Sequence, residues 1–572
     1  MSQPQRKELY SIHIFMSFFN HRAKNVTLAA FILMVTTLIA KLLSLARLRV
    51  FTTLFTTEEL DIYFAAFRIP DLLYNVLILG AISTAFIPVF SDYWSKSKEE
   101  AWKLCNNVLC VFLGLLIILA ILLAIFAPQL MHLVAPGFDD AKMNLLVRLT
   151  RIMFLSPIIL GISNIFGSLL QYFSRFLIYS LAPIMYNVGI ILGALFFAPK
   201  MGIEGLAWGV VLGAVFHLCV QLPAVFLSGY RFNAVFDFSH QGLRKIFKLM
   251  VPRTIGLAAQ QINLIIMTAI ASLLAVGSIT IFNISNDLQY IPISLFGVSF
   301  ATAVFPSLSR SFSRAKASLN KAKKEKEKFM QKFISVFSQI LFFTLPLSIL
   351  FFLLRAQLVR IIPGSENYTW QDTRLTAACL GIFAFSIFAQ SLIPLITRAF
   401  YSFQDTKTPV KISVFSIILN IIFAFLFVYI FSFNNGLYYF FQSFLKLEGI
   451  SQISIIGLPL AFSLSSVINL ILLLSAFKKR VGDHWDLKLG NVFLRILFLS
   501  LLCGGVTFGC LHLFALFFDL QTFGRIFLQA IFAGGIGLIF YIYLSKILHF
   551  PEYDLIFEPF LARKKYGNKE KK

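Results

Sequence analysis

Apolar residues run through most of this chain in stretches of about 20 or more, separated by short polar segments. A helix needs about 20 mostly apolar residues to cross the hydrocarbon core of a bilayer. The pattern predicts fourteen membrane-spanning helices, at approximately 26–51, 68–91, 104–128, 146–170, 177–198, 203–228, 247–275, 279–305, 331–355, 374–397, 410–432, 453–476, 491–516 and 524–547. Sustained alternation of apolar and polar residues, which is typical of outer-membrane barrel strands, does not occur.

Composition narrows the class of protein further. Of the 572 residues, 58% are apolar or aromatic and 13% are charged, and the mean hydropathy is +0.82. Soluble domains are usually about 45–50% apolar and about 25% charged. The chain is therefore predicted to be an all-α polytopic membrane protein, and an ordinary soluble enzyme, a disordered chain and a disulfide scaffold are excluded.

The net charge of +24 is distributed unevenly along the chain. If the N-terminus is cytoplasmic, the segments on the cytoplasmic side carry 35 Lys and Arg, and the opposite loops carry 10, boundary residues included. Cytoplasmic loops of membrane proteins are enriched in these residues, so the split predicts cytoplasmic termini and an even number of spans. We interpret the basic cluster at 310–332 as a solvated loop that contacts anionic lipid, and we expect no nucleic-acid partner.

Similar motifs recur about 220 residues apart. Ile69-Pro and Phe86-Ile-Pro in the second stretch resemble Ile291-Pro and Phe305-Pro in the eighth. A shift of six spans preserves orientation, so the repeat predicts two parallel six-helix lobes, as in many transporters. The predicted organisation is a cytoplasmic segment, an N-lobe, a linker, a C-lobe, two additional helices and a basic tail, at 1–25, 26–228, 229–246, 247–476, 491–547 and 548–572.

Charged residues inside the predicted spans are the candidate binding residues. Lys41 lies within the first stretch, Arg47 near its outer end, and Arg68 at the start of the second. A charge at the centre of a membrane helix costs about 2.5–3.5 kcal/mol on insertion scales, so such residues usually serve a function. A cavity lined by these three cations would attract an anion such as phosphate, although the arginines alternatively snorkel to the interface.

Acidic and amide side chains accompany these cations. Asp61 and Asp71 are expected to pair with them when the cavity is empty, and Asn75 lies in the same stretch. Asn286 and Asp287 in the eighth stretch are expected to face the cavity from the second lobe, where Asp287 could pair with Lys41 or Arg47. The alternative for this second group is local hydrogen bonding between helices.

No motif for catalysis or for a cofactor occurs. The six cysteines lack CxxC spacing, the eight histidines form no HExxH motif, and neither a Walker A sequence nor GxGxxG is present. The cysteines are therefore interpreted as packing residues. We expect a protein without enzymatic activity, metal or cofactor.

Several of these stretches resemble the MurJ/MviN family of lipid II flippases. The similar segments include Ala40-Lys-Leu-Leu-Ser-Leu-Ala-Arg47, Leu60-Asp-Ile-Tyr-Phe-Ala-Ala-Phe-Arg-Ile-Pro-Asp-Leu-Leu73 and Phe400-Tyr-Ser-Phe-Gln-Asp-Thr-Lys-Thr-Pro409. The resemblance extends from about residue 26 to 480. It implies the fold of the multidrug/oligosaccharidyl-lipid/polysaccharide exporter superfamily, in the bacterial cytoplasmic membrane, with spans 13 and 14 forming a groove for a lipid tail.

The resemblance also implies a substrate and its binding residues. The substrate would be lipid II, an undecaprenyl-pyrophosphate-linked peptidoglycan precursor, which moves from the inner to the outer leaflet by alternating access. Lys41, Arg47 and Asp61 stand at positions that resemble the family's charged sites. Two positions differ, because Tyr74 and Asp287 stand where the family has basic residues.

Two other functions remain open from the sequence. A flippase for a different polyprenyl-pyrophosphate-linked glycan would also need a cationic cavity, so charge alone does not separate it from a lipid II flippase. A membrane scaffold that has lost transport would tolerate the differences at Tyr74 and Asp287.

Overall fold

The computed structural model describes residues 26–79, 82–317, 322–482, 488–517 and 522–555. Throughout these residues the secondary structure is helical, and no strand occurs in them. Each of the fourteen predicted stretches falls on helix. The all-α prediction is therefore confirmed. The predicted segment 1–25 and residues 556–572 of the predicted tail lie outside the described residues.

Ten of the described helices are long and apolar enough to span a membrane, or eleven if the pair α19 (Trp370–Ala384) and α20 (Ile387–Ser402), bent by 46°, forms one span. The three remaining predicted spans, at 26–51, 68–91 and 247–275, are helical but contain more polar residues or a break. These three are also the spans that carry most of the candidate binding residues of the first half of the chain. The total of fourteen spans stays a prediction.

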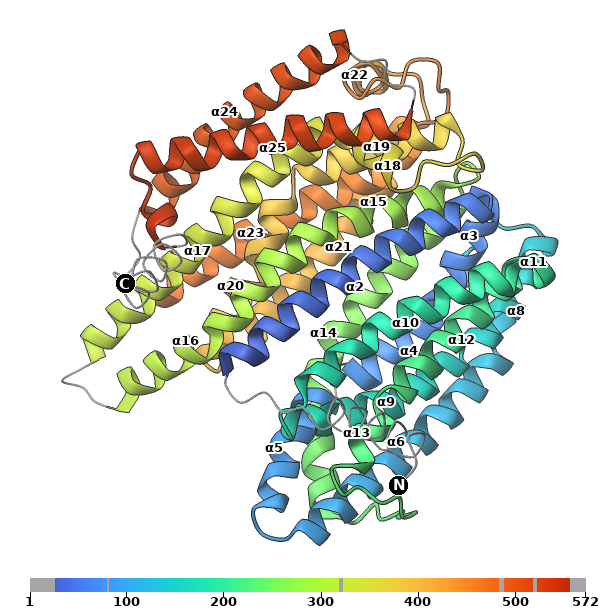
Figure 1. Cartoon of the computed structure of the whole chain (residues 1–572), viewed down its shortest axis with the longest axis vertical. Coiled ribbons are helices and arrows are strands. Elements are labelled where there is room, and N and C mark those ends of the chain that lie inside the picture. Colours follow the sequence, from blue (N-terminus) through green and yellow to red (C-terminus); the bar gives the residue numbers. More distant parts are fainter. Residues whose placement is uncertain (1–25, 80–81, 318–321, 483–487, 518–521, 556–572) are drawn as a thin grey trace, which may run out of the picture. The chain divides into compact units, whose positions relative to one another are not determined.

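The chain forms two compact units, residues 1–280 and 281–572. The first unit contains fourteen helical segments in its described part (Figure 1). These are α2 (Val26–Leu54), α3 (Thr57–Ala66), α4 (Arg68–Tyr74), the π-helical η1 (Asn75–Leu79), α5 (Ile82–Trp94), α6 (Lys98–Ile125), α7 (Ala127–Val134), α8 (Asp140–Met153), α9 (Leu155–Tyr172), α10 (Phe176–Phe196), α11 (Ala198–Met201), α12 (Ile203–Cys219), α13 (Leu222–Phe226) and α14 (Gln241–Ser272).

The second unit begins within α15 and includes the two helices predicted to stand outside the repeat. Its described segments are α15 (Ser278–Pro292), the π-helical η2 (Ile293–Val298), α16 (Ser299–Ala317), α17 (Ala322–Leu353), α18 (Arg355–Ile361), α19, α20, α21 (Lys407–Phe431), α22 (Gly436–Phe444), the 3₁₀-helical η4 (Ser454–Ile456), α23 (Gly457–Val481), α24 (Lys488–Phe517) and α25 (Phe523–Ile547). α24 and α25 pack side by side, and α24 also packs on α17 (Figure 1).

Glycines bring α10 and α12 into close contact. A Cβ atom added at Gly193 would lie 2.1 Å from the Cα of Gly209, and one at Gly189 would lie 2.4 Å from the Cα of Gly213. Small residues let helix backbones approach closely in membranes, where van der Waals packing drives association. The two helices therefore form a wall whose spacing tolerates no side chain at these positions.

Aromatic rings fill the interior of the second unit. The rings of Phe333 on α17 and Phe477 on α23 stack with centroids 4.5 Å apart, and Phe403 stacks on Phe477 at 6.0 Å. The Tyr541 hydroxyl of α25 donates a hydrogen bond of 2.8 Å to the carbonyl of Phe342 on α17. Dispersion between large rings, rather than close backbone contact, holds these helices together.

The turns after α9 and α20 have the same geometry. Ser174 and Gln404 have positive φ values of 60° and 61°. The amide of the residue that follows each one, Arg175 or Asp405, donates a hydrogen bond to the carbonyl five residues earlier. This pattern is the Schellman motif of a helix C-terminus. The two turns follow the fourth and tenth predicted spans, which the six-span shift of the predicted repeat pairs with each other, so the structural similarity supports that prediction.

Each unit also contains one π-helical segment in a repeated position. η1 follows the Ile69-Pro70 dipeptide, and η2 follows Ile291-Pro292. A π-helical turn holds an additional residue compared with an α-helical turn and is frequent at functional sites. η1 lies directly beside the polar residues described next.

Candidate functional site

The two cations of the first span lie on α2. Lys41 and Arg47 are both half-buried. The guanidinium of Arg47 lies 5.7 Å from the ring centroid of Phe51, and it is close enough to Tyr63 and Tyr186 to interact with them electrostatically. The Nε–H of Arg47 is buried and has no hydrogen-bond acceptor among the described residues. A buried donor of this kind is costly, so it favours an anion as its partner.

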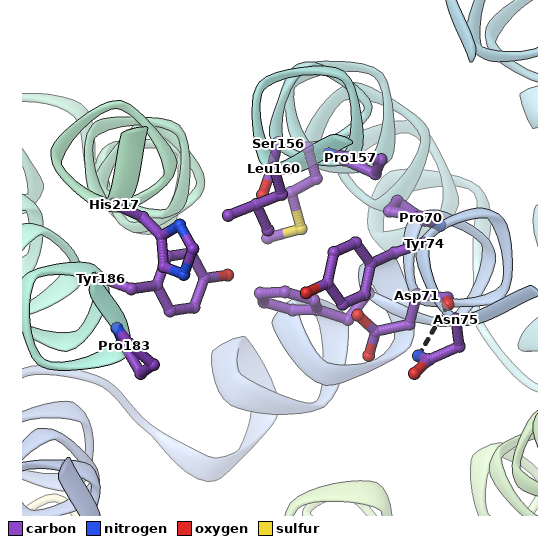
Figure 2. A pocket seen from close by; sticks show the side chains of 12 residues that line it. Pro70, Asp71, Tyr74, Asn75, Ser156, Pro157, Leu160, Pro183, Tyr186 and His217 are labelled. Atoms are coloured by element: carbon purple, nitrogen blue, oxygen red, sulfur yellow. Dashed lines mark hydrogen bonds between the residues drawn. The ribbon is translucent and has the colours of Figure 1, made fainter. Parts of the chain in front are cut away.

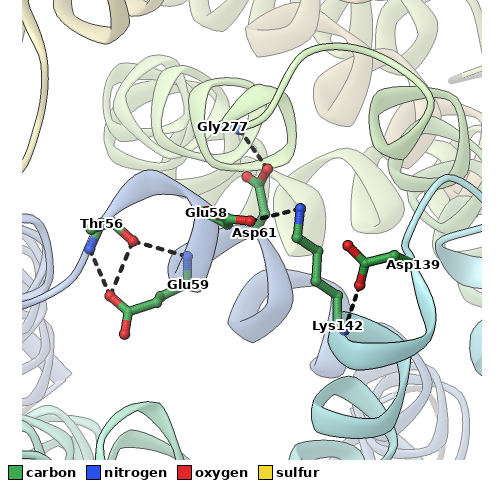
Figure 3. Close-up of polar contacts among 7 residues, drawn as sticks. All are labelled: Thr56, Glu58, Glu59, Asp61, Asp139, Lys142 and Gly277. Atoms are coloured by element: carbon green, nitrogen blue, oxygen red, sulfur yellow. Dashed lines mark hydrogen bonds and ion pairs between the residues drawn. The ribbon is translucent and has the colours of Figure 1, made fainter.

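Asp61 on α3 binds backbone amides (Figure 3). Its Oδ2 accepts a hydrogen bond of 2.7 Å from the amide of Gly277, and its Oδ1 accepts one of 2.7 Å from the amide of Thr280. The Thr280 hydroxyl donates to the carbonyl of Thr57 at 3.1 Å. Asp61 is 5% exposed. Its carboxylate therefore satisfies amides at a helix N-terminus, which is a structural role in addition to the predicted pairing with cations.

The surroundings of Asp61 are also polar (Figure 3). Lys142 Nζ lies 2.7 Å from a carboxylate oxygen of Glu58. Thr56 and Glu59 form a reciprocal capping box at the start of α3. This arrangement fixes the first turn of α3 and thereby positions Asp61, because the Glu59 amide donates to the Thr56 hydroxyl and the Thr56 amide donates to the Glu59 carboxylate.

Arg68, the third predicted cation, is buried at the start of α4. Its Nε donates a hydrogen bond of 2.6 Å to the hydroxyl of Thr268 on α14. Its side chain is 7% exposed. Arg68 therefore connects α4 to α14, and it does not snorkel to the interface.

A cavity of about 280 Å³ opens in the first unit between α4, α9, α10 and α12 (Figure 2). It is lined by Phe67, Pro70, Asp71, Tyr74, Asn75, Met153, Ser156, Pro157, Leu160, Pro183, Tyr186 and His217. None of the described residues in this wall is a lysine or an arginine. Of the polar residues predicted from the sequence to accompany the cations, Asp71 and Asn75 line this cavity, whereas Lys41, Arg47 and Arg68 are not among its lining residues.

Hydrogen bonds orient the polar side chains of the cavity wall. The Asn75 amide donates to the carbonyl of Asp71 at 2.8 Å, and the Asn164 amide donates to the Tyr74 hydroxyl at 3.2 Å. His217 Nδ1 lies 2.7 Å from the Ser163 hydroxyl, which also accepts a hydrogen bond of 2.8 Å from the Gln221 amide. In Figure 2 the Asp71 carboxylate and the rings of Tyr74 and Tyr186 point toward the cavity.

The two candidate residues of the second unit lie on α15. Asn286 is half-buried and its Oδ1 accepts a hydrogen bond of 2.9 Å from Gln289, which in turn accepts one of 2.9 Å from Gln390 on α20. Asp287 is exposed. The network through Gln289 is the local hydrogen bonding between helices that the sequence left open as an alternative.

Sequence reasoning missed part of the cavity wall. Tyr186 and His217 lie on α10 and α12, more than 100 residues after Asp71. A single histidine and a single tyrosine in apolar spans carry no signal that they share a wall with Asp71. Asp71, by contrast, is singled out from the sequence, because it lies in the same short segment as Arg68 and Asn75.

Metal ligation finds no support in the part of the chain that the structure describes. There, no group of three or more His, Cys, Asp or Glu side chains is placed so that it could hold a metal ion.

Solved structures share this fold. A lipid II flippase MurJ in an inward closed conformation matches with a TM-score of 0.70 and 23% identity, over 91% of this chain and 99% of that one. An inward-facing MATE family multidrug resistance transporter of the MOP superfamily matches with a TM-score of 0.63 and 14% identity, over 78% of this chain and 95% of that one. The fold thus defines an all-α polytopic membrane protein with the architecture of these transporters.

The chain belongs to the lipid II flippase MurJ family, whose family model matches residues 50–528. The probable lipid II flippase MurJ of Buchnera aphidicola subsp. Acyrthosiphon pisum is 28% identical over 521 residues, which cover 90% of this chain and 95% of the relative. The lipid II flippase MurJ of Burkholderia cenocepacia is 28% identical over 402 residues, 68% of this chain and 76% of the relative. The predicted family is confirmed, and the chain is a multi-pass protein of the bacterial cytoplasmic membrane.

Proposed function

We propose that this protein is a flippase that moves lipid II from the inner to the outer leaflet by alternating access, with both chain termini in the cytoplasm. The family match over residues 50–528 supports the substrate. The observation that carries the binding site is the buried Nε–H of Arg47, which has no acceptor among the described residues. A pyrophosphate oxygen is a suitable acceptor, because arginine forms strong charge-assisted hydrogen bonds with phosphate.

Lys41 would supply the second positive charge for the pyrophosphate from the same helix. Lys41 and Arg47 are both half-buried, so an anion bound to them would be only partly screened by water. Arg68 would contribute charge from α4 while its Nε remains bonded to Thr268. Asp61, Asn75, Asn286 and Asp287 stay predicted polar contacts of the hydrated head.

The transport step separates the two parts of the lipid. The sugar-peptide head would cross in a polar cavity, while the prenyl tail stays in lipid beside α24 and α25, within the predicted tail groove at 491–547. Unpaired polar groups cost several kcal/mol each in hydrocarbon, which is why the head needs a protein path. An inside-negative membrane potential would favour release of the anion outward, by about 2.3 kcal/mol per charge per 100 mV.

Charge reversal tests the proposal. The full-length protein, expressed in a bacterium depleted of its own lipid II flippase, should restore growth. The double variant Lys41→Glu/Arg47→Glu should lose this rescue, because it replaces two attractions for pyrophosphate with two repulsions. Lys200→Glu is the matched control, since Lys200 is exposed in the first unit and should retain rescue.

Two further measurements identify the substrate. Purified protein in liposomes should translocate fluorescent lipid II, and the double variant should not. Comparison with a simpler polyprenyl-pyrophosphate-linked sugar separates a lipid II flippase from a flippase for another glycan. Normal rescue by a well-folded Lys41→Glu/Arg47→Glu variant would refute the proposed pyrophosphate site.

A further inference from the structure

The cavity in the first unit has the opposite chemistry from a phosphate site. Its wall contains one carboxylate, Asp71, and the aromatic rings of Phe67, Tyr74 and Tyr186 (Figure 2). No lysine or arginine is found among the described lining residues. A wall without a cationic side chain offers an anion no charge-assisted hydrogen bond.

A carboxylate combined with several aromatic rings suits an organic ammonium group. The negative faces of aromatic rings attract a cation within about 6 Å of the ring centroid. A carboxylate adds a charge-assisted hydrogen bond to an N–H donor. We propose that this cavity binds the ammonium group of an organic amine. This proposal rests on the proposed function, and the ammonium group is therefore assigned to the free amine on the stem peptide of lipid II.

The size of the cavity agrees with this assignment. Its volume of about 280 Å³ is at the lower limit of the roughly 300–1,000 Å³ of small-molecule pockets. Such a space admits an amine-bearing side chain.

The wall side chains are held in position before any ligand binds. Asn164 orients the Tyr74 hydroxyl, and the Asn75 amide is bonded to the carbonyl of Asp71. Ser163 holds the His217 ring through Nδ1. Preorganised groups of this kind gain affinity because little ordering remains to be done on binding.

The position of the cavity in the first unit gives the substrate two anchors of opposite sign. Arg47 is outside the lining residues but interacts electrostatically with Tyr186, a residue of the wall. The proposed pyrophosphate site on α2 and the ammonium site would then contact two different ends of one zwitterionic head. A lipid without an amine would use only the first anchor.

Acetylation of the substrate tests the inference directly. We would measure binding of the full-length protein in nanodiscs to lipid II and to lipid II whose stem-peptide amine is acetylated. For the wild type, acetylation should weaken binding by roughly tenfold or more, the loss expected for one hydrogen bond to a charged group. For Asp71→Asn, the two lipids should bind equally, with the affinity of the wild type for the acetylated lipid.

Matched variants separate recognition from folding. Asp92→Asn is the control, because Asp92 is an exposed carboxylate of α5 that pairs with Lys245 at 2.8 Å, and it should behave as the wild type. Tyr186→Leu removes an aromatic ring and should reduce the acetylation effect without lowering affinity for the acetylated lipid. Retention of the full acetylation effect in Asp71→Asn would overturn the inference.

Two small probes distinguish the source of the cation. Butylammonium chloride should compete with lipid II in the wild type and not in Asp71→Asn. If butylammonium chloride competes while acetylation of lipid II has no effect, the cavity binds a free amine and not the amine of lipid II. Competition by sodium chloride and not by butylammonium chloride would instead indicate an inorganic cation site and refute the inference. Failure of the wild type to bind either lipid would count against the proposed function itself.

Discussion

Two aspartates ten positions apart, Asp61 and Asp71, occupy contrasting surroundings in the first unit. Asp61 is buried, and each of its carboxylate oxygens accepts a hydrogen bond from a backbone amide; Figure 3 shows the one from Gly277. Asp71 is half-buried and lines a cavity beside aromatic rings (Figure 2). The first carboxylate holds the chain together, whereas the second faces a space that a ligand can enter. The surroundings of the side chain, rather than residue type or position in a span, distinguish these two carboxylates.

The largest expected effect concerns the wall of the cavity. Gly193→Val should prevent correct folding, because its Cβ atom would lie 2.1 Å from the Cα of Gly209 and the contact is with backbone. Overpacking usually costs about 1–3 kcal/mol, and a backbone contact leaves less room to relax. The measurement is the yield of monodisperse protein in detergent. Gly505→Val is the control, since no atom lies within 4 Å of its Cβ position. Equal yields for both variants would show that the close glycine contact does not determine the spacing of α10 and α12.

A smaller effect is expected when the structural carboxylate is neutralised. Asp61→Asn keeps the shape of the side chain but removes the charge that two amides share, and it turns an NH₂ group toward one of them. Hydrogen bonds to charged groups contribute about 1.5–3 kcal/mol, so the thermal unfolding midpoint should fall by several degrees. Asp71→Asn should lower the midpoint by less, because Asp71 is half-buried whereas Asp61 is 5% exposed. If Asp71→Asn destabilises the protein as much as Asp61→Asn, the distinction between the two regions is wrong.

The smallest expected effect concerns a third carboxylate, that of Asp405. Asp405 precedes α21 and accepts hydrogen bonds from the Thr408 amide at 3.0 Å and from its hydroxyl at 2.7 Å. Burial alone would raise the pKa of Asp405, but these two hydrogen bonds, together with the positive charge of Arg480 and the Lys407 amide, hold the pKa below its ordinary value. Asp405→Ala should cost about 1 kcal/mol, as for the loss of an N-terminal helix cap.

The pH dependence of that cost has a defined sign. Because the folded pKa of Asp405 is lowered, its contribution is present above the unfolded value, near pH 4, and disappears as the pH falls through the folded value. The difference in unfolding midpoint between the wild type and Asp405→Ala should therefore be seen at pH 7 and shrink in acid. A difference that grows in acid would contradict the assigned hydrogen bonds.

The helices could be predicted from the sequence, but the environment of each charge could not. Apolar stretches of about 20 residues specify membrane helices almost independently of tertiary contacts, and so every predicted stretch is helical. The partners of Asp61 lie 216 and 219 residues away along the chain, and no local pattern links them. From the sequence, Arg68 could be assigned to the interface or to a cavity. Its hydrogen bond to Thr268 could not be predicted, because Thr268 also lies far away along the chain.

Tyr74 illustrates the limit of a family resemblance. From the sequence, a tyrosine in place of a basic residue indicates only a lost charge. In the structure Tyr74 lines the cavity together with Asp71, and Asn164 holds its hydroxyl. The structure therefore gives Tyr74 a place in the cavity wall, which single-residue comparison does not reveal.

The π-helical segments η1 and η2 change the side of the helix on which the later residues of spans 2 and 8 lie. An α-helix advances about 100° per residue, and a π-helical turn contains one residue more than an α-helical turn. A helical wheel drawn straight through Asn75–Leu79 or Ile293–Val298 would therefore assign every later residue to the wrong side by about 100°. Cysteine-accessibility scans and cross-link designs across spans 2 and 8 need two separate wheels, one on each side of the extra residue.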